Sequence, residues 1–211
     1  MKFAATILPV VALAGAAVAD VVLPGPGTTY IKGVTYNGSG CPISPPSATV
    51  SLADDYSAFT VSFQQFIVQT GPGIARTENR KNCQLSVGIH IPGGWQLSIA
   101  STDFRGWSQL DPKVTGLITT QYYFQGDGKT VGTTARVAAG TVDSYQLHEE
   151  IAFTSMSWSA CGEDSNVQIN TSIFADNSKA PTQSGLLTTD SIDGKVTQIY
   201  GFQWQRCPGS K

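Results

Sequence analysis

Five carboxylates are the side chains with which this chain could hydrolyse a glycosidic bond, a reaction that needs two acids facing each other across a cleft. They are Asp103, Glu149, Glu150, Glu163 and Asp164. Glu149 shares the parity of Leu147 and Ile151 in a predicted strand over residues 145–153. A carboxylate among core side chains must be paired or have a shifted pKa. Glu149, with Asp103 or Glu163, is therefore the candidate pair for a glycan-active hydrolase.

Two other interpretations of Glu149 stay open. Arg105 or Arg206 could pair with it, or a bulge near His148 could rotate it out to solvent. Bulges are common in antiparallel sheets, so the bulge is the simpler interpretation. We assign no catalytic role to Glu149 on this basis.

Nucleophilic catalysis has few candidates, because a Ser or Cys nucleophile needs an adjacent base and only His90 and His148 are histidines. The chain has no G-x-S-x-G motif. His90 falls on the polar face of its predicted strand, which favours an exposed surface histidine. The sequence thus favours a non-enzymatic protein without an organic cofactor.

Four tryptophans raise the possibility of sugar binding by ring stacking: Trp95, Trp107, Trp158 and Trp204. All except Trp107 follow the apolar parity of a strand or flank a cysteine, which favours core packing. Trp107 lies in the segment 103–111, which we interpret as an exposed loop. We therefore predict a surface binding patch formed by Asp103, Arg105 and Trp107.

The four cysteines, Cys41, Cys83, Cys161 and Cys207, predict two disulfides in an exported chain. Of the three possible pairings we favour Cys41 with Cys83 and Cys161 with Cys207, because these join neighbours in sequence. A zinc site is the competing interpretation, but no CxxC spacing occurs and both histidines are far from any cysteine. We expect no metal.

Two N-glycosylation sequons are present, at Asn37-Gly38-Ser39 and Asn170-Thr171-Ser172. Asn170 falls on the polar parity of its predicted strand, which supports exposure. Both asparagines are therefore candidate glycosylation sites.

The first 19 residues predict a secretory signal peptide, with a positive start, an apolar run and Ala17-Val18-Ala19 before the cleavage point. The apolar run is too short and too broken by Pro9 for a membrane anchor. We predict an extended lead-in over residues 20–40, a single domain over residues 41–207 and a C-terminal tail over residues 208–211. A net charge of −2 offers no electrostatic footprint for nucleic acid or a membrane surface.

Period-two alternation of apolar and polar residues predicts strands along the domain. Leu85 to Ile91 and Trp95 to Ile99 could form a hairpin across the Pro92-Gly93-Gly94 break, and Asp193-Gly194 signals another hairpin turn. Tyr122-Tyr123-Phe124 suggests a strand covered on both sides. No stretch shows an apolar helical period. We predict an all-β, antiparallel two-sheet β-sandwich, jelly-roll-like, with two disulfides.

Several short motifs together resemble a family of secreted fungal proteins, the domain of unknown function 4360. These motifs are Gly40-Cys41-Pro42, Asn82-Cys83, Pro92-Gly93-Gly94-Trp95, Asp103-Phe104-Arg105-Gly106, Tyr122-Tyr123-Phe124-Gln125-Gly126, Trp158-Ser159-Ala160-Cys161-Gly162 and Trp204-Gln205-Arg206-Cys207. The resemblance implies a secreted four-cysteine β-domain and carries no reaction or ligand with it.

We expect a secreted, monomeric interaction protein, such as a fungal effector that binds, and could inhibit, a host extracellular protein such as an apoplastic protease. The alternative partner is a cell-wall glycan, bound through Trp107 and neighbouring tyrosines. A glycan-active hydrolase is the third hypothesis. Export, disulfides and the lack of a coherent catalytic set support the first.

Overall fold

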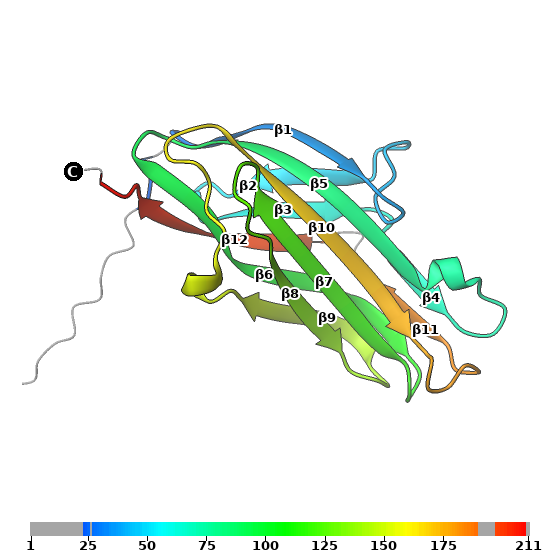
Figure 1. Cartoon of the computed structure of the whole chain (residues 1–211). Coiled ribbons are helices and arrows are strands. Elements are labelled where there is room, and N and C mark those ends of the chain that lie inside the picture. The colour runs from blue at the N-terminus through cyan, green and yellow to red at the C-terminus, as the bar shows by residue number, and fades with distance from the viewer. Residues whose placement is uncertain (1–22, 26, 190–196, 210–211) are drawn as a thin grey trace, which may run out of the picture.

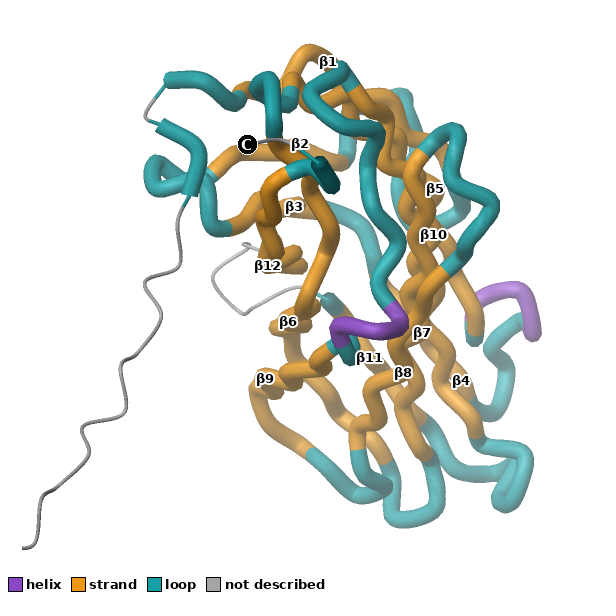
Figure 2. Tube along the Cα trace, turned by 60° about the vertical axis from the view of Figure 1, so that its left-hand side comes forward, coloured by secondary structure: helices purple, strands orange, loops and turns teal. Residues whose placement is uncertain are grey.

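The computed structural model describes residues 23–25, 27–189 and 197–209. Within these residues the chain forms twelve strands and two short 3-10 helices, η1 (Arg76–Glu78) and η2 (Phe153–Ser155). The strands make two antiparallel sheets, which appear as two facing layers in Figures 1 and 2. The predicted signal peptide and the Asp193-Gly194 turn lie outside the described residues.

The first sheet, sheet A, has five strands with β10 at its centre. Its order is β1 (Tyr30–Asn37), β5 (Arg80–His90), β10 (Ser165–Asp176), β7 (Thr115–Phe124) and β8 (Val131–Val137). Figure 1 shows β5, β10 and β7 running side by side along the length of the molecule. Strand β1 lies within the expected lead-in, so part of that segment is integrated into sheet A.

The second sheet, sheet B, is built around the 16-residue strand β6 (Trp95–Leu110). Its order is β2 (Ala48–Leu52), β3 (Ala58–Phe63), β12 (Thr197–Arg206), β6, β11 (Gly185–Thr188) and β4 (Ile67–Thr70). Strand β9 (Val142–Glu150) lies outside this order and pairs with residues 101–109 of β6.

The predicted two-sheet sandwich is confirmed, and its cause is the alternation of side chains along each strand. Leu85, Val87 and Ile89 of β5 are at most 2% exposed, while the residues between them face solvent. On the other sheet, β3 shows the same pattern, with Phe59, Val61 and Phe63 buried. Since successive side chains of a strand point to opposite faces, each sheet contributes one apolar face to a shared core.

Two local predictions are wrong. Strands β5 and β6 do not form a hairpin, because they belong to different sheets and residues 91–94 carry the chain across the sandwich. Strand β7 is covered on one face only, since Tyr122 and Phe124 are buried but Tyr123 between them is 39% exposed.

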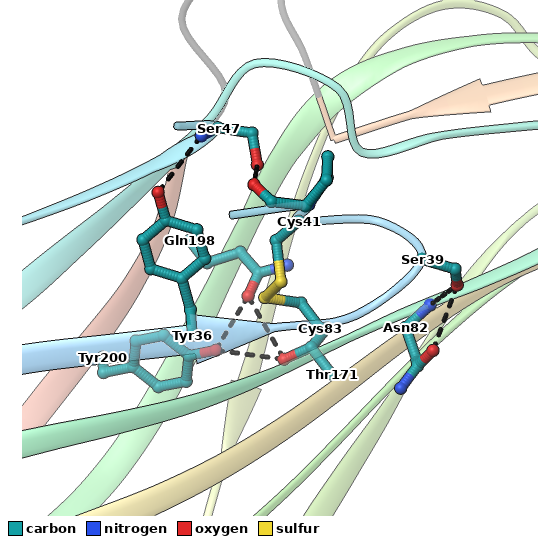
Figure 3. The surroundings of a disulfide bond; sticks show 10 residues. Tyr36, Ser39, Cys41, Ser47, Asn82, Cys83, Thr171, Gln198 and Tyr200 are labelled. Atoms are coloured by element: carbon teal, nitrogen blue, oxygen red, sulfur yellow. Dashed lines mark hydrogen bonds between the residues drawn. A yellow bond between two sulfur atoms is a disulfide. The ribbon is translucent and has the colours of Figure 1, made fainter. Parts of the chain in front are cut away.

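Both predicted disulfides are confirmed, Cys41 with Cys83 and Cys161 with Cys207. The first ties Cys41, in the segment after β1, to Cys83 near the start of β5 (Figure 3). In the same region the Ser39 side chain bonds with the Asn82 side chain at 3.1 Å. These contacts fix where the chain leaves sheet A relative to β5.

A buried polar cluster links the two sheets in the centre of the core (Figure 3). The Tyr200 hydroxyl donates to Gln198 Oε1 at 2.7 Å, and both residues belong to β12 of sheet B. Thr171, on β10 of sheet A, bonds with the hydroxyl of Tyr200 at 3.2 Å. Because buried polar groups must find partners, this cluster restricts how β10 can slide over sheet B.

Candidate functional site

Four amide side chains form one row across the outer face of sheet A. Asn37 of β1 lies opposite Gln84 of β5, and Gln84 lies opposite Asn170 of β10. Asn170 in turn lies opposite Gln121 of β7. We call Asn37, Gln84, Asn170 and Gln121 the amide row.

Strand parity places the amide row on the solvent side. Gln84 stands between the buried Cys83 and Leu85, and Asn170 stands between the buried Ile169 and Thr171. Since their neighbours point into the core, these amides must point outward. All four members of the row are exposed.

The amide row is free of intramolecular side-chain hydrogen bonds among the described residues. Other amides on the same face are already engaged, since Gln168 Nε2 donates to Ser86 Oγ at 2.6 Å and Asn166 Nδ2 donates to Gln125 Oε1 at 3.0 Å. Each free amide offers two donors and one acceptor oxygen. The row therefore presents a dense set of unused hydrogen-bonding groups.

The outer face of sheet A is also hollowed into a continuous depression. Four hollows of about 410, 240, 190 and 640 Å³ open on it. Neighbouring hollows share lining residues: the first pair shares Thr35 and Ser86, the second Gln84 and Gln168, and the third Gln121 and Asn170. We call this depression, with the amide row across it, the trough.

Tyr123 supplies an aromatic surface in the trough. It lines the same hollow as Gln84, Gln121 and Asn170, and its ring is 39% exposed. Its phenol makes no hydrogen bond within the described part of the chain. A half-exposed tyrosine beside free amides offers both a flat apolar surface and a polar tip.

Among the described residues that line the trough, charged side chains lie at its two ends. At one end Lys32 pairs with Asp164, and His90 Nδ1 lies 2.6 Å from Asp164 Oδ1. Hydrogen bonds with Lys32 and His90 hold the pKa of Asp164 below its ordinary value. At the other end Lys81 pairs with Glu78 at 2.8 Å, and the exposed Arg80 lines the same hollow. The central part between these pairs is uncharged.

The predicted patch of Asp103, Arg105 and Trp107 lies elsewhere, on the outer face of sheet B. The interpretation of residues 103–111 as a loop is wrong, because β6 extends to Leu110. All three side chains point outward from this strand, where Arg105 is exposed and Asp103 and Trp107 are half-buried. The structure thus brings the three together on one face, opposite the trough.

His148 of β9 joins that patch. It lies directly opposite Asp103, and its Nδ1 is 2.9 Å from Asp103 Oδ1. Its Nε2 is 3.6 Å from Glu150 Oε1. The hydrogen bond with Asp103 raises the pKa of His148 above its ordinary value.

Glu149 and Asp103 lie on opposite faces of sheet B. Glu149 is half-buried and lies opposite the buried Thr102, whereas Asp103 faces solvent. The expected bulge near His148 is absent, since β6 and β9 pair without a register shift. Among the described residues no three His, Cys, Asp or Glu side chains gather to hold a metal ion. The remaining acid, Glu163, is exposed in the segment before β10.

Sequence reasoning missed Gln84, Gln121 and Tyr123 as a group. They come from two strands, and only the register of β5, β10 and β7 places them beside one another. The available signal was the abundance of uncharged polar residues at wet strand positions. That signal marks exposure and does not mark which residues become neighbours.

A family model described as "Domain of unknown function (DUF4360)" matches residues 28–207. An uncharacterized secreted protein of Arthroderma benhamiae is 39% identical over 186 residues, which cover 87% of this chain and 74% of the relative. The protein is likewise secreted and extracellular. Within the described residues, no helix has the length and apolar character to cross a membrane.

Two solved structures resemble the chain in outline. The carbohydrate-binding module TmCBM61, solved with β-1,4-galactotriose, is 11% identical with a TM-score of 0.33, covering 83% of this chain and 90% of the module. The enzymatically active domain of bacteriophage CBA120 tailspike protein 4 is 13% identical with a TM-score of 0.24, covering 83% of this chain and 20% of that one. Similarities of this size carry no argument about a ligand.

Proposed function

We propose that this chain, which belongs to the family described as "Domain of unknown function (DUF4360)", is a secreted protein that binds an extended, uncharged glycan in the trough of sheet A. The observation that carries the proposal is the amide row, four adjacent amides whose side chains make no hydrogen bond to any described residue. The function is binding, with no reaction assigned to the trough.

The chemistry of the amide row matches that of a sugar. Each sugar hydroxyl is both a donor and an acceptor, and so is each amide. One amide can therefore bond two neighbouring hydroxyls at once. Because each net hydrogen bond contributes only about 0.5–1.5 kcal/mol, several must act together, and Gln84, Asn170 and Gln121 stand on three adjacent strands.

The shape of the trough favours a chain over a single sugar. The amide row crosses four neighbouring strands. At about 4.8 Å between strands this is a span of roughly 15 Å, the scale of several linked sugars. Four connected hollows along this face also leave the ligand open to continue beyond the row.

The charge distribution favours a neutral glycan. An acidic polymer would need cations along its length, but the lining cations stand only at the two ends, Lys32 at one and Arg80 with Lys81 at the other, and both lysines already have an acidic partner. Tyr123 instead offers a ring against which a sugar face can stack.

Retention on insoluble polysaccharides tests the proposal. The mature protein, produced in a host that does not attach N-linked glycans, is mixed with chitin, cellulose and β-glucan, and the bound fraction is compared with that of Gln84→Ala/Gln121→Ala. The matched control is Gln109→Ala/Gln146→Ala, which removes two exposed amides from the outer face of sheet B. We expect retention on at least one polymer, lost in the first double variant and kept in the control. Equal retention by all three proteins would contradict the proposal.

A second candidate function, binding of a host extracellular protein by a fungal effector, is favoured by the patch on sheet B. Arg105 and Trp107 are of the residue types that dominate protein interfaces, and Asp103 and His148 beside them add charge. Pull-down from host apoplastic fluid should then recover a saturable partner, such as a protease, whose capture is lost in Arg105→Ala/Trp107→Ala. If the variant still captured the same partner, the patch would be excluded as its binding site.

A further inference from the structure

Both glycosylation sequons lie inside the trough. Asn37 and Asn170 flank Gln84 in the amide row, one on each side. Asn37 stands on β1, an edge strand of sheet A, whereas Asn170 stands on the central strand β10. A group attached to Asn37 can leave over the edge of the sheet, but a group attached to Asn170 emerges in the middle of the trough.

The surroundings of Asn170 suit an attached glycan. Its side chain is exposed and bonds to nothing within the described residues, so modification breaks no contact of the fold. Gln84 and Gln121 stand on either side in the same row, about 5 Å away along the direction of strand pairing. The first sugar on Asn170 would therefore lie among the groups proposed to bind an external glycan.

We propose that Asn170 carries an N-linked glycan that occupies the trough, so that its own glycan and an external glycan exclude each other. The exclusion rests on the proposed function, while the occupancy of the trough does not. A population of molecules lacking the glycan at Asn170 would be the form that binds.

The attachment uses a lipid-linked oligosaccharide of the secretory pathway as donor. The side-chain amide nitrogen of Asn170 forms a bond to the anomeric carbon of the first sugar. The bond from that carbon to the lipid diphosphate breaks, the diphosphate leaves and the amide nitrogen loses one proton. The hydroxyl of Ser172 completes the sequon.

Ser172 permits a test that leaves the amide of Asn170 in place. Ser172→Ala removes the sequon, and Ser172→Thr preserves it with a change of similar size. Each protein is secreted from a glycosylating eukaryotic host, and glycopeptide mass spectrometry reads Asn170. We expect the glycan on the natural chain and on Ser172→Thr, and its loss in Ser172→Ala. An unmodified Asn170 in the natural chain would overturn the proposal.

Binding to the polysaccharide that retains the protein measures the exclusion. We expect Ser172→Ala to bind more tightly than the glycosylated forms by about tenfold or more, the equivalent of roughly 1.4 kcal/mol. Trimming the glycan with an endoglycosidase should recover part of the difference. Equal affinity of the modified and unmodified forms would overturn the exclusion.

Footprinting of Tyr123 separates this inference from the proposed function. Tyr123 lines the same hollow as Asn170, so an attached glycan in the trough should slow its oxidation by hydroxyl radicals several-fold relative to Ser172→Ala. Tyr30, at the other end of the trough beside His90, is the internal reference. If Ser172→Ala binds no polysaccharide but Tyr123 is protected by the glycan, the proposed function fails and occupancy stands. Equal oxidation rates would overturn occupancy.

Discussion

The hydroxyl of Tyr145 passes directly over Gly106 and donates a hydrogen bond to the carbonyl oxygen of Thr188 at 2.6 Å. Gly106 lies in the middle of β6 and is buried, so its missing side chain is what lets β9 and the end of β11 close over the strand. Burial raises the pKa of Tyr145 well above its ordinary value, so its hydroxyl keeps its proton. This contact holds the strand that carries Arg105 and Trp107.

Gly106→Ala should therefore strongly destabilise the fold. A Cβ at this position would overlap the Thr188 carbonyl oxygen and the Tyr145 hydroxyl, and the first is backbone that cannot move aside. We expect a loss of about 3 kcal/mol in the free energy of unfolding, measured by urea denaturation. The control is Gly33→Ala in β1, where a Cβ meets nothing within 4 Å and stability should be unchanged or slightly raised. Equal behaviour of the two variants would contradict this account.

Tyr123→Ala should weaken polysaccharide binding, and Trp107→Ala should not. Tyr123 lies in the trough on sheet A, and Trp107 lies on the opposite sheet. Loss of a stacking ring worth about 1 kcal/mol corresponds to roughly fivefold in affinity. Isothermal titration with a soluble oligosaccharide of the retained polymer measures the effect, and Tyr123→Phe should keep most of the affinity. If Trp107→Ala lost affinity for the glycan and Tyr123→Ala did not, the glycan site would lie on sheet B and not in the trough.

Local alternation predicted most of the fold, because it depends only on which residues must be buried. Val61, Leu85 and Val87 are buried where their parity requires, and neighbouring cysteines are paired. The wrong hairpin between β5 and β6 has a different cause. A Pro-Gly-Gly break suits a tight turn and a crossing between sheets equally well, and only the partners of each strand distinguish the two.

The trough could not be predicted, because its members become neighbours only through register. Asn37 and Gln121 are far apart in sequence, and in the sequence each resembles any other polar residue on the solvent-facing side of a strand. The exposure of Tyr123 could not be predicted, because it stands between two aromatic residues that are buried and residue type alone does not say which face a side chain takes. The patch with Asp103 was predicted as a group, although in a loop, because its members stand at alternate positions of one strand.

Removal of the first disulfide by Cys41→Ala/Cys83→Ala should destabilise the fold by about 4 kcal/mol in the loop-entropy model. Its cysteines are 42 residues apart, and those of the second disulfide are 46 apart. Cys161→Ala/Cys207→Ala should therefore lose a similar amount, which urea denaturation of both variants measures. A difference of several kcal/mol between the two would show that loop closure does not dominate their contribution.

Asp103→Asn should lower the pKa of His148, because the hydrogen bond with Asp103 is the main cause that raises it. A raised pKa in the folded state stabilises the fold at pH values below the ordinary histidine pKa of about 6.5, and this contribution is lost as the pH rises through the raised value. The natural chain should therefore exceed Asp103→Asn in stability at about pH 5.5 and match it at about pH 8.5. The difference will be small because His148 is exposed.

The His148 ring resonances, followed by NMR from about pH 5 to about pH 9, measure the pKa directly. Glu150→Gln is the matched variant and should shift it less, since the Glu150 carboxylate stands farther from the ring, at 3.6 Å, than that of Asp103, at 2.9 Å. An unchanged His148 curve in Asp103→Asn would mean that the two side chains do not interact in solution. The sheet B patch would then lack the charged contact that joins β6 to β9.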